Sequence, residues 1–257
     1  MFIETQLADS IGTITLNQPA KRNALSRALI EEVIAALAEF QKAEARVVIL
    51  RASPDAKVWS AGHDIAELPQ GKDPLQFSDP LERLLRAIQT FPAPVIAMVH
   101  GSVWGGATDL ALSCDLIVGD ETCSFAITPA NLGLAYNTVG LLHFMRQLPL
   151  NKVKEMFFTA APVKAEDAAK CGILNHLVPA DQLEPFTYDL ARLMTTKAPL
   201  VLAAVKEQLR LLAQAAPLTP ETFERVQELR QRVYQSEDYA EGIRAFHEKR
   251  KPEFKGR

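Results

Sequence analysis

The chain has 257 residues, of which 48% are apolar and 23% are charged. These proportions are typical of a folded globular protein and exclude disordered, collagen-like and disulfide-scaffold chains. Lys and Arg total 28 and Asp and Glu total 31, so the formal net charge is −3. The resulting pI of about 6.0 argues against a general nucleic-acid-binding protein.

The three cysteines, Cys114, Cys123 and Cys171, form an odd and scattered set. Such a set is typical of reduced thiols in the cytoplasm, and no two of these residues have the spacing of metal ligands. The first ten residues, MFIETQLADS, lack the basic and apolar pattern of a signal peptide. We therefore expect a cytoplasmic protein without a bound metal.

Short β-rich runs alternate with helical ones in the first half of the chain. The sequence predicts helices over 26–43 and 79–91 and strands over 12–17, 46–52, 94–101 and 115–120. The second helix opens with Asp79 as N-cap, Pro80 in the first turn and Glu82 placed as in a capping box. This alternation favours an α/β fold with a mainly parallel sheet covered by helices.

From about residue 140 onward the pattern becomes mostly helical, and Gly172 is expected to end one of these helices. We therefore expect an α/β core over residues 1–195, followed by a helical region over residues 196–257.

The longest stretch without Lys, Arg, Asp or Glu runs from Thr122 to Met145. It is long enough to raise the question of a membrane span. Helix-breaking and polar residues interrupt it, at Pro129, Asn131, Gly133, Asn137 and Gly140. We expect no membrane span here, but a buried segment that lines a dry pocket.

The last 14 residues, RAFHEKRKPEFKGR, contain six Lys or Arg and two Asp or Glu, a local charge of +4. A basic tail on an acidic body is suited to a phosphorylated ligand. A solvated helix end, favoured by the helix dipole, explains the same pattern.

Two loops rich in small residues follow two of the predicted strands. The first is SAGHDI at 60–65 and the second is GSVWGGA at 101–107. Either loop alone is a weak signal, and Gly105 and Gly106 are equally compatible with tight packing of a helix against a strand. Together, the loops are able to present one backbone N–H each to the same point, which would make an oxyanion hole. The sequence contains no serine elbow, HExxH motif or P-loop beside them.

With these motifs the chain resembles the enoyl-CoA hydratase/isomerase superfamily, or crotonase family, along nearly its whole length. The resemblance is carried by KRNAL at 21–25, SAGHDI at 60–65, HGSVWGGATDLALSCDL at 100–116, FAITPANLGL at 125–134 and EKRKPEFKGR at 248–257. It implies a fold of repeated β-β-α units followed by a helical trimerisation region, assembled as a homotrimer or as a hexamer built from two trimers.

The resemblance also implies an acyl-CoA thioester substrate and an enolate intermediate. The thioester oxygen would accept hydrogen bonds from the backbone N–H groups of His63 and Gly106. No cofactor is implied beyond the coenzyme A that the substrate carries, and no nucleic-acid or membrane partner. The residues expected to contact the substrate are Arg22, Ala24, Ala61, Gly62, Asp64, Ile65, Trp104, Gly105, Lys249 and Lys251.

Two departures from the family pattern limit the reactions that we expect the chain to catalyse. Hydratases of this family use two carboxylates to orient water and move its protons. This chain has Asp109 at the first position, one methylene shorter than the usual Glu, and Pro129 at the second. A proline cannot transfer a proton, so an efficient hydratase or an isomerase that depends on this second acid is disfavoured.

Decarboxylation of a malonyl-type thioester needs no base to start it, because the electrons of the broken C–C bond flow into the thioester. The residues SAGHDI, SVWGGA, TPANLG and AYN also resemble the bacterial decarboxylase branch of this family, which acts on methylmalonyl-CoA. This branch implies conversion of methylmalonyl-CoA or malonyl-CoA to propionyl-CoA or acetyl-CoA. It places Tyr136 and Thr128 beside the substrate carboxylate.

Several roles stay open in the sequence. The His63 imidazole either protonates the enolate or fixes its loop, and Asp109 either orders a water molecule or donates a proton. The other histidines, among them His143, have no recognisable partner and are expected to be structural. The alternative functions are an enoyl-CoA hydratase for short-chain substrates and a non-catalytic relative that binds CoA esters or RNA.

Overall fold

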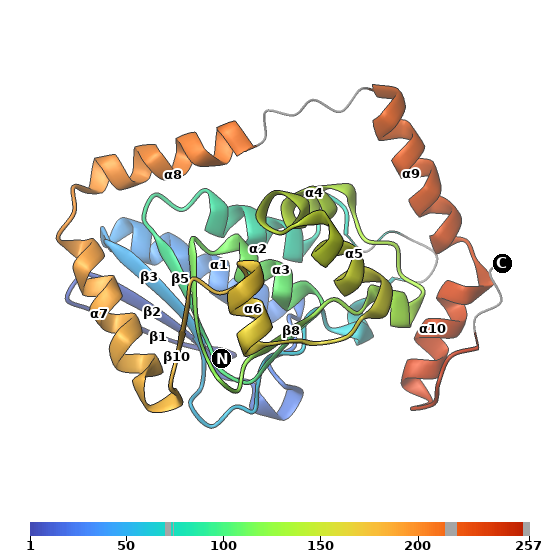
Figure 1. The fold of residues 1–257 in the computed structure, drawn as a ribbon, viewed down its shortest axis with the longest axis horizontal. Helices are drawn as coiled ribbons and strands as arrows, with labels where there is room; N and C mark the ends of the chain where they lie inside the picture. The colour runs from blue at the N-terminus through green and yellow to red at the C-terminus, as the bar shows by residue number, and fades with distance from the viewer. Residues whose placement is uncertain (70–72, 74, 214–219, 254–257) are drawn as a thin grey trace.

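The computed structural model describes residues 1–69, 73, 75–213 and 220–253 (Figure 1). Within this part of the chain, the larger sheet has the strand order β1-β2-β3-β5-β7-β10, and only β1 and β2 are antiparallel. The mainly parallel sheet expected from the sequence is therefore confirmed. Its strands are β1 (Ile3–Ala8), β2 (Ile11–Leu16), β3 (Val47–Ala52), β5 (Val95–Val99), β7 (Leu116–Asp120) and β10 (His176–Val178).

A second, smaller sheet has the order β4-β6-β8-β9. Three of its strands directly follow a strand of the larger sheet and precede a helix, so the chain repeats a β-β-α unit as expected. Strands of two or three residues are too short to show alternation, which is why the sequence does not reveal them. They are β4 (Val58–Ser60), β6 (Ser102–Trp104), β8 (Ser124–Ala126) and β9 (Val163–Lys164).

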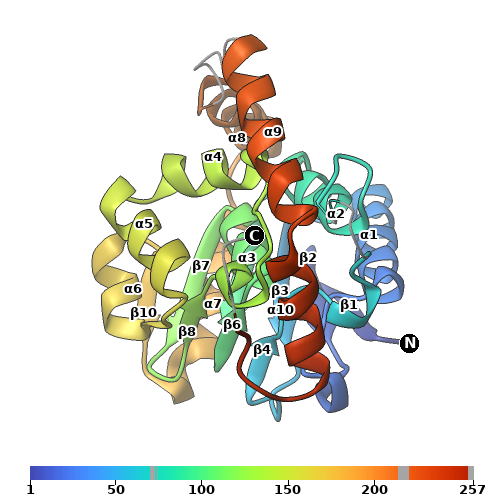
Figure 2. The same cartoon turned by 90° about the vertical axis from the view of Figure 1, so that its right-hand side faces the viewer.

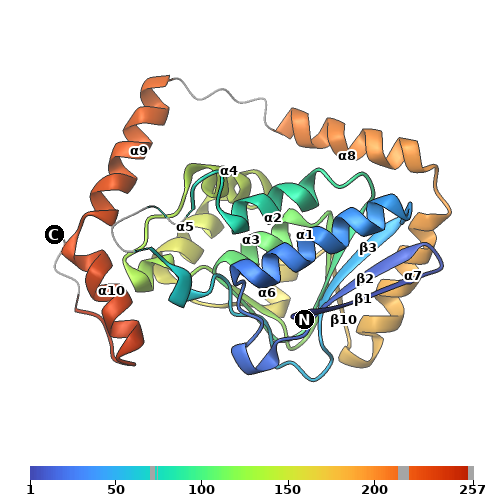
Figure 3. The same ribbon diagram turned by 180° about the vertical axis from the view of Figure 1, so that it is seen from behind.

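Helices cover both faces of the larger sheet. One face lies against the main hydrophobic core, to which α1 and α2 contribute Leu29, Val33 and Leu84. Figure 3 shows α1 and α2 side by side. The Ser26 side chain caps α1 by accepting a hydrogen bond from the Leu29 amide. The α-helices between β2 and β10 in the chain are α1 (Arg27–Lys42), α2 (Pro80–Gln89), α3 (Gly106–Ser113), α4 (Thr138–Gln147), α5 (Leu150–Thr159) and α6 (Ala165–Cys171).

Strand β3 explains why the run RVVILRA contains so few polar residues. Val48 and Leu50 point into the main core, while Val47 and Ile49 join a second apolar cluster on the opposite face. Helix α7 (Leu183–Thr195) covers that opposite face. A strand buried on both faces requires a continuous apolar sequence.

The C-terminal helices are α8 (Pro199–Ala213), α9 (Pro220–Tyr234) and α10 (Glu237–His247). Helix α8 extends along the edge of the molecule and has no buried residue (Figure 1). Lys206 connects it to the body through a 2.7 Å ion pair with Asp115. No helix in the described part of the chain is long and apolar enough to span a membrane.

Helix α10 folds back onto the body of its own chain (Figure 2). A methyl group on Gly242 would lie 2.2 Å from the carbonyl oxygen of Leu132, and the Tyr239 hydroxyl donates a 3.0 Å hydrogen bond to the carbonyl of Pro69. The 3-10 helix η3 (Pro129–Leu132) is therefore held between α10 and the core; the other 3-10 helices are η1 (Pro19–Lys21), η2 (Ile65–Glu67) and η4 (Ala180–Gln182).

One local prediction is wrong. Asp79 and Pro80 do begin α2, but Glu82 does not complete a capping box. Its side chain is buried and accepts a hydrogen bond from the Asn137 amide instead. The prediction for Gly172 is confirmed, because this residue ends α6 in the left-handed conformation with φ of 89°.

Candidate active site

The loop that carries His63 is attached to the preceding KRNAL turn by backbone hydrogen bonds. The Ala61 amide donates to the Arg22 carbonyl at 2.8 Å, and the Leu25 amide donates to the Gly62 carbonyl at 2.7 Å. These bonds leave the His63 amide without an acceptor among the described residues. The N–H group of His63 is therefore available to a ligand.

The side chain of Asn23 fixes this turn to β4. It is fully buried, and its side-chain amide donates a 3.0 Å hydrogen bond to the carbonyl of Trp59 in β4. The Ser60 hydroxyl donates a 2.6 Å hydrogen bond to the Asn23 carbonyl. A buried polar side chain with all of its bonds satisfied fixes a loop more strongly than apolar packing does. The KRNAL motif therefore positions the His63 amide.

The second loop brings the Gly106 amide beside the first. The Gly105 amide donates a 2.8 Å hydrogen bond to the Ala126 carbonyl of β8, whereas the Gly106 amide, at the start of α3, has no acceptor within the described chain. A methyl group on Gly106 would lie 3.7 Å from the His63 amide nitrogen and 2.6 Å from the Leu81 side chain. His63 and Gly106 thus lie close together and line the same small pocket.

This space is a pocket of about 60 Å³, here called the reaction pocket. The described residues that line it include no Lys, Arg, Asp or Glu, so its interior is neutral apart from the His63 ring. A pocket of this size suits a short acyl group and not a long fatty chain. Its lining residues are Ala61, His63, Ile65, Leu68, Leu75, Leu81, Gly105, Gly106, Thr128, Pro129, Leu132, Leu134 and Tyr136.

The His63 ring has one nitrogen committed to its own loop. Nδ1 lies 3.1 Å from the carbonyl oxygen of Asp64, and a carbonyl only accepts, so Nδ1 carries the hydrogen. The neutral ring therefore has no proton on Nε2 to give to a substrate. Asp64 is likewise occupied, because its carboxylate accepts from the Ala66 amide at the start of η2.

Thr128 and Tyr136 face the reaction pocket from the segment around η3. The Thr128 hydroxyl has no hydrogen-bond partner among the described residues and is free to bind a ligand. The Tyr136 hydroxyl donates a 2.7 Å hydrogen bond to Oδ2 of Asp109. Burial, and secondly the negative charge of Asp109, raise the pKa of Tyr136 well above its usual value.

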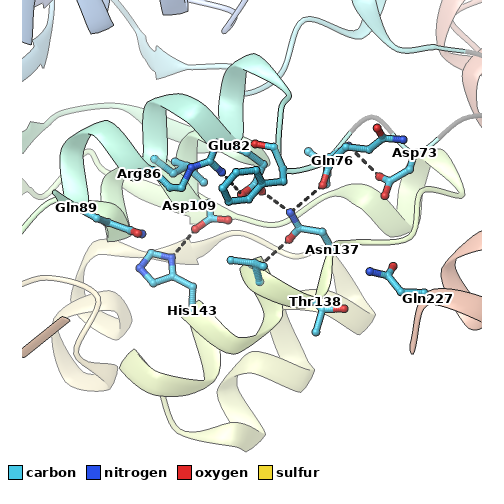
Figure 4. A pocket seen from close by; sticks show the side chains of 15 residues that line it. Asp73, Gln76, Glu82, Arg86, Gln89, Asp109, Asn137, Thr138, His143 and Gln227 are labelled. Atoms are coloured by element: carbon cyan, nitrogen blue, oxygen red, sulfur yellow. Dashed lines mark hydrogen bonds and ion pairs between the residues drawn. The ribbon is translucent and has the colours of Figure 1, made fainter. Parts of the chain in front are cut away.

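Asp109 does not line the reaction pocket. It is 1% exposed on α3 and lies behind Tyr136, at the edge of a larger cavity of about 510 Å³ between α2 and α4 (Figure 4). Nδ1 of His143 lies 2.6 Å from the second carboxylate oxygen of Asp109. The expectation that His143 has no partner is therefore wrong, and nothing in the sequence relates two residues 34 positions apart.

The larger cavity contains a second acid, Glu82, which the sequence indicates only as part of a capping box. Burial raises the pKa of Glu82 to about 7, although the hydrogen bond from Asn137 opposes the shift. The Asn137 amide also donates to the Leu75 carbonyl at 3.2 Å, and its oxygen accepts from the Gly140 amide at 2.6 Å. Figure 4 shows Glu82 and Asn137 side by side, from α2 and the start of α4.

The remaining predicted substrate contacts are dispersed. Arg22 and Ala24 lie on the turn beside the His63 loop, and the carbonyl of Trp104 packs against Gly62. Lys249 and Lys251 follow α10 and are exposed, and neither lines the reaction pocket. In the described part of the chain there is no group of three or more His, Cys, Asp or Glu side chains able to hold a metal ion.

Comparison with known proteins agrees with this geometry. The enoyl-CoA hydratase/isomerase family model matches residues 6–257. The chain is 46% identical over 256 residues to the methylmalonyl-CoA decarboxylase of Escherichia coli (strain K12), covering 99% of this chain and 98% of that protein. It is 30% identical to the 2,3-dehydroadipyl-CoA hydratase of the same organism, with 95% and 94% of the two chains covered.

Solved structures of similar proteins also match this chain. A methylmalonyl-CoA decarboxylase in complex with 2-nitronate-propionyl-CoA matches with a TM-score of 0.98 at 46% identity, covering 100% of this chain and 99% of that one. A methylmalonyl-CoA decarboxylase complexed with 2S-carboxypropyl-CoA gives the same TM-score and coverage. The chain belongs to the enoyl-CoA hydratase/isomerase family, and it has the crotonase fold.

Proposed function

We propose that this enzyme is a carbon–carbon lyase that decarboxylates methylmalonyl-CoA or malonyl-CoA to propionyl-CoA or acetyl-CoA. The observation that carries the proposal is the reaction pocket, which combines two free backbone amides with a lining free of acids and cations among the described residues. The 46% identity to a methylmalonyl-CoA decarboxylase supports it.

The two amides supply what the reaction needs. When the C–C bond to the carboxylate breaks, its electron pair moves into the thioester and the carbonyl oxygen becomes an oxyanion. The N–H groups of His63 and Gly106 donate to this oxygen, and each such donor is typically worth about 3–4 kcal/mol of transition-state stabilisation. A pocket without Lys or Arg among its described lining residues does not stabilise the substrate carboxylate with an ion pair, so no such interaction has to be broken when CO2 leaves.

We assign Tyr136 and Thr128 the task of orienting the substrate carboxylate. Both line the pocket together with the two amides, so they are able to hold the carboxylate out of the thioester plane. In that orientation, the breaking bond overlaps the π system of the thioester. Arg22, Ala24 and Trp104, on the loops around the pocket, would contact the CoA part of the substrate, and Lys249 and Lys251 its phosphates.

The hydratase alternative lacks both of its acids. Pro129 occupies the pocket wall where the second carboxylate would lie, and Asp109 is separated from the pocket by Tyr136, to which it is hydrogen-bonded. Water added to a double bond in this pocket would have no carboxylate to orient it. The geometry therefore favours the reaction that begins without a base.

Incubation of the purified protein with methylmalonyl-CoA and with malonyl-CoA tests the proposal. We expect CO2 together with propionyl-CoA or acetyl-CoA, without added cofactor or metal, and no hydration of crotonyl-CoA at a comparable rate. Product no faster than in buffer alone, or hydration as the faster reaction, would show that the assignment is wrong.

We also propose that residues 1–195 form the catalytic core and that residues 196–257 mediate assembly into a trimer or hexamer. The support is the apolar surface of α8, where Leu200, Leu209 and Leu212 are each more than 60% exposed. Apolar faces of this kind are typical of subunit interfaces. A cytoplasmic location is in keeping with the three free cysteines.

A further inference from the structure

We propose that His143 and Asp109 supply, through Tyr136, the proton that replaces CO2 on the substrate. The inference rests on the proposed decarboxylation, which consumes one proton for each CO2 released. It goes beyond it by assigning a proton route between two cavities: the reaction pocket, which Tyr136 lines, and the larger cavity, which His143 and Asp109 line.

The three side chains form an unbroken series of short contacts. The Tyr136 hydroxyl lies 2.7 Å from Oδ2 of Asp109, and Nδ1 of His143 lies 2.6 Å from Oδ1. Asp109 is 1% exposed, whereas the His143 side chain is 16% exposed and also borders a third cavity next to α8. Protons from solvent therefore have access to His143, and the buried Asp109 connects His143 to the reaction pocket (Figure 4).

The hydrogen-bond directions follow from Gln147. Its side-chain nitrogen donates a 2.8 Å bond to the Leu112 carbonyl, which fixes the orientation of the amide, and the same nitrogen lies 2.6 Å from Nε2 of His143. An amide NH2 group only donates, so Nε2 accepts and the His143 hydrogen is on Nδ1, directed at Asp109. In this resting state Asp109 is an ionised carboxylate that accepts from both His143 and Tyr136.

In the resting state Tyr136 has no proton to give to the α-carbon, because its one proton points at Asp109. A proton that enters at Nε2 of His143, after the exposed Gln147 side chain moves aside, changes this. The proton on Nδ1 passes to Oδ1 of Asp109. The carboxyl group then turns about its Cβ–Cγ bond, so that the protonated oxygen donates to the Tyr136 oxygen. The hydroxyl proton of Tyr136 becomes free to point into the reaction pocket.

The bonds that form and break in this transfer balance. The C–C bond to the carboxylate breaks, CO2 leaves, and the electron pair remains in the enolate. The α-carbon forms a C–H bond with the Tyr136 proton, and the Tyr136 oxygen takes the proton of Asp109. His143 returns to its resting state by gaining a solvent proton at Nδ1 and losing the one at Nε2, so the cycle takes up one proton for each CO2 released. Tyr136 faces the carboxylate before cleavage, so it faces the same side of the α-carbon once CO2 has left.

Other groups are less suited to this task. The neutral His63 ring has its hydrogen on Nδ1, directed at its own loop, and the Thr128 hydroxyl has no described partner from which to recover a proton. Among the described residues, the charged side chains that line the two cavities bordered by His143 are Asp73; Glu82 and Arg86 on α2; Asp109 on α3; Asp115; Arg146 on its own helix; and Lys206 and Arg210 on α8.

The experiment separates proton transfer from bond cleavage. The first rate is CO2 release from methylmalonyl-CoA in a single turnover. The second is the exchange of α-hydrogens of propionyl-CoA in D2O, followed by mass spectrometry, which runs the protonation step in reverse. The first variant is His143→Asn, whose amide still donates to Asp109 but cannot transfer a proton. The second is Tyr136→Phe. The matched control is His176→Asn, at the exposed first residue of β10.

We expect His143→Asn to lower the exchange rate at least tenfold more than CO2 release, and His176→Asn to change neither. Tyr136→Phe should abolish exchange. Equal losses of both rates in His143→Asn would indicate a purely structural role and overturn the proposal, as would unchanged exchange or a wild-type protein without exchange above the buffer rate. Absence of CO2 release in the wild type would instead contradict the proposed function.

Discussion

Gly62 lies so close to Trp104 that a methyl group on its Cα would be 2.3 Å from the Trp104 carbonyl oxygen. Its φ of +80° is also in the region that side chains other than glycine rarely adopt. Both constraints fall on the residue just before His63. The position of the His63 amide therefore depends on the absence of a side chain at Gly62.

We predict that Gly62→Ala loses most of its activity while it stays folded. The clash displaces the His63 amide, and loss of one oxyanion donor typically costs about 10²–10³-fold in kcat. Gly172→Ala is the matched control, because Gly172 has a φ of +89° but no atom within 4 Å of an added methyl group. Steady-state CO2 release should fall in the first variant only; similar kcat values for both would contradict the role of the His63 amide.

Tyr136→Phe should impair decarboxylation more than Asp109→Asn does. Phenylalanine removes the hydroxyl that orients the carboxylate, and misplacement of a reacting group is able to cost about 10²-fold. Asparagine at 109 is able to donate to the Tyr136 oxygen, which leaves the hydroxyl proton free for the substrate. We expect Asp109→Asn to retain single-turnover CO2 release within about tenfold of the wild type. A greater loss of single-turnover CO2 release in Asp109→Asn than in Tyr136→Phe, together with crotonyl-CoA hydration by the wild type, would favour the hydratase alternative.

The stability of the fold should depend on pH through Glu82. Its pKa is raised to about 7 in the folded protein from 4.5, so the folded state binds the proton more tightly than the unfolded state. The carboxyl group therefore imposes no penalty below about pH 4.5, and the penalty grows as the pH rises toward 7 and is complete above it.

We predict that Glu82→Gln stabilises the protein at pH 8 by about 3 kcal/mol and has little effect at pH 4.5. The Gln side chain still accepts from the Asn137 amide, so the local hydrogen bond is kept. Urea unfolding at the two pH values measures the difference. Glu121→Gln, at an exposed position, is the control and should show no such pH-dependent gain; an equal gain in both variants would exclude burial as the cause.

The assembly proposal makes a separate prediction for α8. Leu209→Glu places a charge on the exposed apolar face of this helix, where Leu209 is 63% exposed. Light scattering after size exclusion should then show the mass falling from three or six subunits to one. Leu7→Glu, on the exposed side of β1, should leave the mass unchanged. A monomeric wild-type protein would show that α8 has another role.

Local sequence patterns predict the buried strands and the helices, because each pattern reports on contacts of a single element. The run RVVILRA predicts β3 since both of its faces are buried. The two glycine-containing loops were predictable for the same reason: each follows a strand whose end fixes its direction.

Contacts between distant residues were not predictable in this way. Glu82 fits a capping box by its spacing from Asp79, but its side chain binds Asn137, 55 residues away. The partner of His143 is Asp109, in a different helix. Only the packing of α2, α3 and α4 around a common cavity brings these side chains together, and no local periodicity encodes that packing.

The contact of α10 with its own chain has a consequence for protein synthesis. Tyr234, Tyr239 and Ile243 pack behind Ile65 and Leu134, which line the reaction pocket. The wall of the pocket is thus supported by residues that are synthesised 100 or more positions after the wall itself. A nascent chain, or a fragment cut before α10, lacks this support, so catalytic competence arrives only when translation has passed this helix.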